Sequence, residues 1–119
     1  MGIPTFEWLA RYELLSTTEP PGPFDSRATG SVPGEGVGAL ILKRLADAKR
    51  DGDRIHGIIR GIGVSRAEDR RQALRNAMQR GLESAGLQPE NVSVIESGSS
   101  GVPDRDRDEI LAIADAYGT

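Results

Sequence analysis

Residues 37–64 read VGALILKRLADAKRDGDRIHGIIRGIGV, and this stretch decides the fold. Residues 37–42 are all apolar or glycine, and a second apolar run begins at Ile55. Uninterrupted apolar runs of this length are typical of strands that are covered on both faces. Between the runs, residues 43–50 contain good helix formers, and Gly52 stands where a helix C-cap is expected. The stretch therefore predicts strand, short helix, strand, with the two strands as antiparallel neighbours.

The sequence after this stretch predicts a helix, a strand and a second helix. Residues 65–68 (SRAE) fit a capping box, in which a hydroxyl and a carboxylate satisfy backbone N–H groups at a helix start. Gly86 and Pro89 end that helix. Its apolar stripe consists of Leu74, Ala77, Met78, Leu82 and Ala85.

Val92, Val94 and Ile95 then form a short apolar run, which predicts a strand. The last helix begins among Asp104, Asp106 and Asp108, because acidic side chains suit the positive end of the helix dipole. Its apolar stripe consists of Ile110, Ile113, Ala114 and Tyr117. A strand pair followed by helix, strand and helix is an α/β fold class.

The first part of the chain contrasts with this pattern. Residues 17–23 (TTEPPGP) predict turn and extended structure, since proline lacks an N–H donor and disfavours helix in the residue before it. A short amphipathic segment precedes them, with Phe6, Leu9, Ala10 and Leu14 at helical spacing. We therefore expect an irregular N-terminal segment at residues 1–22 and an α/β unit at residues 23–119.

Composition excludes several classes of function. The chain has 119 residues and a formal net charge of −3, which argues against a nucleic-acid binder. It has no cysteine and one histidine, so we expect no metal site, no cofactor and no cysteine nucleophile. It also has no apolar run of the length that a membrane span needs, so we expect no contact with a membrane. We expect a cytoplasmic location.

Three patterns raise the question of a site, and each has a structural interpretation that is favoured. The glycine-rich residues 34–38 precede a strand and lack the Gly-Lys-Ser/Thr of a phosphate loop. The serines of residues 96–101 (Ser97, Ser99 and Ser100) have no nearby base to activate them, and a turn is favoured. His56 is interpreted as an ordinary strand residue. The alternating aspartates at 104, 106 and 108 lack the glycine and the distal glutamate of a calcium loop, so helix capping is favoured.

In this order, the segments resemble the β-ketoacyl synthase family. Residues 23–25 (PFD), 32–39 (VPGEGVGA), 42–48 (LKRLADA) and 52–55 (GDRI) look like the family's last strands of the first thiolase half. Residues 82–96 then look like the start of the second half. The resemblance covers Pro23 to Gly118, and it implies a partial thiolase-like fold spanning the junction of the two halves.

The departures from the family pattern concern catalysis. The resemblance places the family's first catalytic histidine, in a His-Gly-Thr-Gly-Thr motif, at Gly98. The family's cysteine and second histidine have no counterpart in the 119 residues. No catalytic residue is therefore expected in this chain, and His56 inherits no role.

This replacement is similar to chain-length factors, the non-catalytic partners of polyketide ketosynthases, as are residues 32–36 and 101–107. The resemblance implies a chain that is not an enzyme on its own and acts with a ketosynthase subunit, by self-association or with an acyl carrier protein. Two alternatives stay open: one piece of a split ketosynthase completed by another chain, and a small binding domain that reuses the scaffold.

Overall fold

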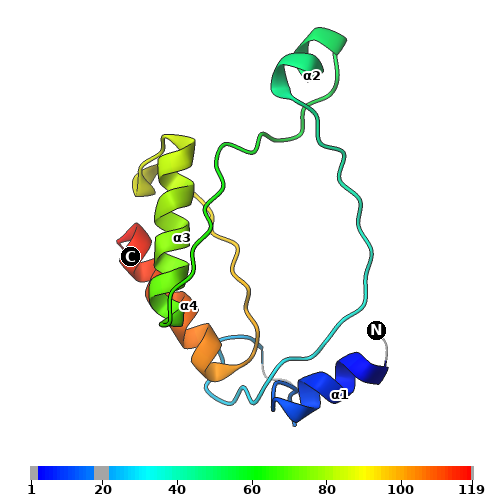
Figure 1. The fold of residues 1–119 in the computed structure, drawn as a ribbon, viewed down its shortest axis with the longest axis vertical. Coiled ribbons are helices and arrows are strands. Elements are labelled where there is room, and N and C mark those ends of the chain that lie inside the picture. The colour runs from blue at the N-terminus through cyan, green and yellow to red at the C-terminus, as the bar shows by residue number, and fades with distance from the viewer. Residues whose placement is uncertain (1–2, 18–21, 119) are drawn as a thin grey trace.

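The computed structural model describes residues 3–17 and 22–118. Its helices are α1 (Ile3–Arg11), α2 (Leu45–Asp51), α3 (Arg70–Ala85) and α4 (Pro103–Tyr117), with a short 3₁₀ turn η1 (Pro89–Asn91). α3 and α4 pack against each other, and η1 contacts α4. The expected amphipathic segment near the N-terminus forms α1 (Figure 1).

The two long helices confirm the predicted pair, with one correction at a helix start. Asp69, rather than Ser65, caps α3, because its carboxylate accepts the Gln72 N–H at 2.6 Å. The expected capping box at residues 65–68 is therefore wrong, and the helix begins one turn later. Gly86 ends α3 with a φ of 66°, and Gly52 ends α2 with a φ of 71°. Both glycines hold the left-handed conformation that was expected of them.

The expected strand pair is not confirmed, because the described residues contain no strand. Residues 32–44 and 53–66 are extended, and so is the segment from residue 92 to the turn before α4. None of these segments is paired in a sheet. We call residues 32–44 the first arm and residues 53–66 the second arm. The two arms run apart from each other and are joined at one end by α2 (Figure 1). A strand needs a neighbour to satisfy its N–H and C=O groups, and neither arm supplies one to the other.

The second arm lies along α3 at two glycines. A Cβ at Gly63 would lie 1.9 Å from the Ala77 carbonyl oxygen, and a Cβ at Gly61 would lie 2.4 Å from the Gly81 carbonyl oxygen. Arg80 also donates a 2.7 Å hydrogen bond to the carbonyl oxygen of Val64. Only glycine permits this approach of the two backbones, so the sequence GIG at residues 61–63 fixes the second arm to α3.

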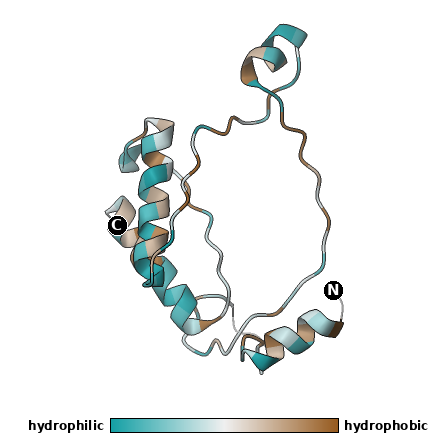
Figure 2. Cartoon of the chain, viewed as in Figure 1, coloured by the Kyte–Doolittle hydropathy of each residue, from teal (hydrophilic) through white to brown (hydrophobic). Residues whose placement is uncertain are grey.

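The chain is much more open than its size predicts. Its accessible surface is 9509 Å², whereas a compact monomer of 12.7 kDa exposes about 6,200 Å². Its radius of gyration is 17.8 Å, against about 13.5 Å for a compact domain of this length. Only four apolar residues are buried among those described, namely Ala28, Ala48, Ala112 and Ala116. Many hydrophobic residues lie along the two arms, where they are exposed to solvent (Figure 2).

None of the described helices is long and apolar enough to cross a membrane.

Candidate functional site

The turn at residues 97–101 joins the extended segment after η1 to the start of α4. Glu109, on α4, binds this turn with both carboxylate oxygens. One oxygen accepts the Gly98 N–H at 2.7 Å, and the other accepts the Ser99 N–H at 3.3 Å. Two successive N–H groups that converge on one point form a natural binding place for an anion. In this chain the carboxylate of Glu109 fills that place.

Ser99 has an unusual backbone conformation at the centre of the turn. Its φ is 42°, a region that residues other than glycine seldom adopt. Its hydroxyl oxygen lies 2.6 Å from that of Ser97, and the two share a hydrogen bond. The hydroxyl of Ser100 donates to the carboxylate of Asp106 at 2.8 Å. These hydroxyls form hydrogen bonds with serine, aspartate and backbone groups, which agrees with the expected structural turn.

Asp106 is the most deeply buried charged residue of the described chain, with 4% of its surface exposed. Its carboxylate accepts the N–H of Ser100 at 2.7 Å, the N–H of Gly101 at 3.0 Å and the N–H of Phe24 at 3.4 Å. Burial by itself would raise the pKa of Asp106, but these donors and the Ser100 hydroxyl together lower the pKa below 3.8. Asp106 therefore stays charged and joins α4, the turn and a loop 82 residues away in sequence.

The same place holds a close backbone crossing. Gly101 has a φ of 76°, and a Cβ on it would lie 2.5 Å from the carbonyl oxygen of Gly30. The Ser31 hydroxyl donates to the carbonyl oxygen of Ser100. We call Phe24, Ser31, Ser100, Gly101 and Asp106 the clasp. It fastens the base of the first arm to the start of α4.

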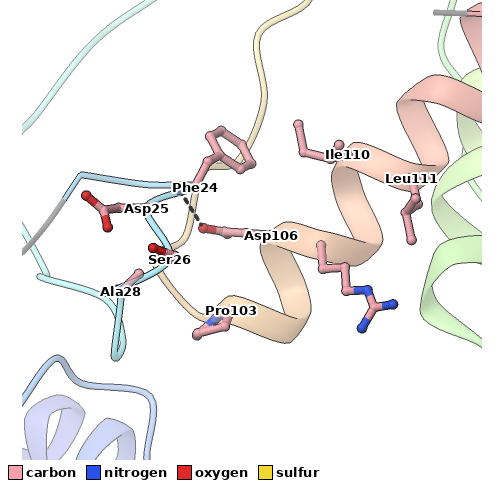
Figure 3. Close-up of a pocket in the computed structure, with 9 residues that line it drawn as sticks. Phe24, Asp25, Ser26, Ala28, Pro103, Asp106, Ile110 and Leu111 are labelled. Atoms are coloured by element: carbon pink, nitrogen blue, oxygen red, sulfur yellow. Dashed lines mark hydrogen bonds between the residues drawn. The ribbon is translucent and has the colours of Figure 1, made fainter.

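A cavity of about 510 Å³ opens beside the clasp. Phe24, Ile110 and Leu111 give it apolar walls, and Asp106 lies at its edge with its hydrogen bond to Phe24 (Figure 3). The loop also carries Asp25, whose pKa falls to about 2 because Arg27 donates side-chain and backbone hydrogen bonds to it. The cavity is formed by the loop at residues 24–28 and the first turns of α4.

The other candidate residues lie apart from the clasp. His56 is on the second arm, where it lines a separate cavity near α2. The glycine-rich residues 34–38 belong to the exposed first arm rather than to a phosphate-binding turn before a helix. Of the three aspartates, Asp106 is buried and Asp104 is exposed. No group of acidic or imidazole side chains in residues 3–17 and 22–118 is arranged to hold a metal ion.

Sequence comparison places these elements in a known family. The β-ketoacyl synthase N-terminal domain matches residues 3–48, and the β-ketoacyl synthase C-terminal domain matches residues 56–119. The chain belongs to the β-ketoacyl synthase family. It spans the junction of the family's two domains, as the resemblance implied, and the N-terminal match begins within α1.

Polyketide synthases are among the relatives of this ketosynthase-family chain. It is 36% identical to 3-methylorcinaldehyde synthase tropA of Talaromyces stipitatus, over 95% of this chain and 4% of the relative. It is 37% identical to putative polyketide beta-ketoacyl synthase 2 of Streptomyces cyaneus, over 90% of this chain and 28% of the relative. The chain thus spans less than a third of the length of these relatives.

Solved ketosynthases have the same fold over this region. The ishigamide ketosynthase/chain length factor superimposes with a TM-score of 0.91 at 29% identity, over 100% of this chain and 30% of that one. The ketosynthase from module 6 of the bacillaene synthase from Bacillus subtilis 168 superimposes with a TM-score of 0.88 at 31% identity, over 98% of this chain and 22% of that one. The thiolase-like fold class is confirmed at this level. Both arms belong to the region that superimposes on these ketosynthases.

Sequence reasoning missed the two acidic residues that organise the turn. Asp106 was interpreted as a helix-dipole residue, and Glu109 was not singled out. The sequence contained a signal for them. Asp106 and Glu109 follow the small residues 97–101, whose backbone N–H groups need acceptors near the start of the helix. The partner loop at Phe24 gave no such signal, because only the fold brings it to α4.

Proposed function

We propose that this chain is a non-catalytic, chain-length-factor-like component of polyketide or fatty-acid assembly. In this role it acts by association with a ketosynthase or an acyl carrier protein and contributes shape and contact. The observation that carries the proposal is the turn at Gly98. The family resemblance places a catalytic histidine at this position, and here the glycine N–H is bound by Glu109.

The chemistry at this turn disfavours catalysis. In the family, an imidazole here would donate to the oxygen of the enolate formed by decarboxylation. A donor of this kind contributes about 3 to 4 kcal/mol to a transition state. A Cβ at Gly98 would lie 3.3 Å from both Glu109 oxygens, so a histidine side chain fits only if Glu109 moves. The carboxylate also repels the carboxylate of a malonyl group that approaches the turn.

The split-ketosynthase alternative is supported by a different observation. The chain matches parts of both family domains and keeps their arrangement, so another polypeptide carrying the remaining parts would complete a ketosynthase. In that case the second polypeptide supplies the cysteine and the remaining histidine. The lack of an imidazole at Gly98 would still slow decarboxylation in the assembled enzyme.

A decarboxylation assay tests the proposal. The purified chain is incubated with carboxyl-labelled malonyl–acyl carrier protein, and released carbon dioxide is measured against an intact ketosynthase. We expect no release above the protein-free blank from the chain, which has no imidazole at position 98, or from its Gly98→His variant, which still lacks the family's second histidine. Release by the unaltered chain alone would refute the non-catalytic role. Release and condensation only on mixing with a ketosynthase fragment would establish the split enzyme.

A further inference from the structure

We draw no further inference here: the strongest candidate, the cavity of about 510 Å³ between the loop at residues 24–28 and the first turns of α4, belongs to the site already described, and nothing in the structure shows what covers its apolar walls at Phe24 and Ile110.

Discussion

Both arms are rich in apolar residues that remain exposed, but only the second arm lies against a helix. Both are apolar extended segments of similar length on either side of α2, and both were expected to be buried strands. The second arm is held against α3 through Gly61 and Gly63, and Arg80 bonds its backbone. The first arm has Val37, Leu40 and Ile41 almost fully exposed.

The difference lies in what each arm finds within the chain. The glycines at alternate positions of the second arm let α3 approach one face, and α3 follows directly in sequence. Val37, Leu40 and Ile41 of the first arm find no such cover. An apolar run thus indicates that a segment is suited to burial, but whether its side chains are buried depends on a neighbouring element of the structure.

The largest expected effect is at the contact that separates the arms. Gly63→Ala places a Cβ 1.9 Å from the Ala77 carbonyl oxygen and forces the second arm away from α3. We expect a loss of about 3 kcal/mol in the free energy of unfolding, measured by urea denaturation with circular dichroism. Gly57→Ala is the matched control, because no atom lies within 4 Å of a Cβ there. Equal losses in the two variants would contradict the glycine contact.

The next effect concerns the clasp that anchors the base of the first arm. Asp106→Asn replaces one of two acceptor oxygens by an NH₂ group that faces N–H donors. We expect a loss of about 2 kcal/mol in the free energy of unfolding and faster amide exchange at Gly101. Asp104→Asn, an exposed position in the same helical turn, should cost only about 0.5 kcal/mol through the helix dipole. If Asp104→Asn lowers the free energy of unfolding as much as Asp106→Asn does, the clasp does not anchor the first arm.

The clasp also predicts a pH dependence. The pKa of Asp106 is lower in the folded chain than its ordinary value of 3.8, so its contribution is complete above pH 3.8 and is lost as the pH falls through the folded pKa. The stability difference between the chain and Asp106→Asn should therefore shrink below pH 3.8. Urea titrations at several pH values measure it. A difference that stays constant into acid would show that the charge of Asp106 has no part in the clasp.

A smaller effect is expected on the helix pair that carries the second arm. Arg71 on α3 donates two hydrogen bonds of 2.7 Å to Asp115 on α4. Their side chains are 41% and 31% exposed, so water and salt screen the pair. Arg71→Gln should cause a small loss of stability, and 1 M salt should reduce that loss. Arg70→Gln, beside it in sequence, should change stability less, and a salt-independent loss at Arg71 would indicate lost packing instead.

The smallest effect is expected on the first arm. Ile41 is 98% exposed, so Ile41→Ser should change the stability of the isolated chain by less than about 0.5 kcal/mol. Denaturation at low protein concentration measures it. A loss of several kcal/mol would mean that the first arm is covered in solution, and the contrast between the arms would fail.

Much of the helical structure could be predicted because its signals are local. The stripe of α3 and the left-handed glycines at Gly52 and Gly86 depend on neighbours a few residues away. The start of α3 was missed because Asp69 is also a good cap and lies closer to the apolar stripe. The expected strands are not confirmed, because strand pairing depends on residues outside the segment itself.

Part of the candidate site could also be predicted from local sequence signals, and part could not. Gly98 could be singled out by its place in a motif, and the serine turn followed from its small residues. The roles of Asp106 and Glu109 could not, because their partners are backbone N–H groups whose positions appear only after the chain folds back. Phe24 meets Asp106 across 82 residues, and no local pattern encodes that contact.

The amino-acid sequence by itself determined the family, the helices and the residue at position 98, because each of these is written in short-range patterns of side chains. Only the tertiary structure decided that the second arm lies against α3 at two glycines and the first arm does not, and that the buried carboxylate of Asp106 joins the loop at Phe24 to the start of α4. The physical reason is that burial and hydrogen bonding are properties of pairs of segments, and a segment's own residues do not specify where its partner lies.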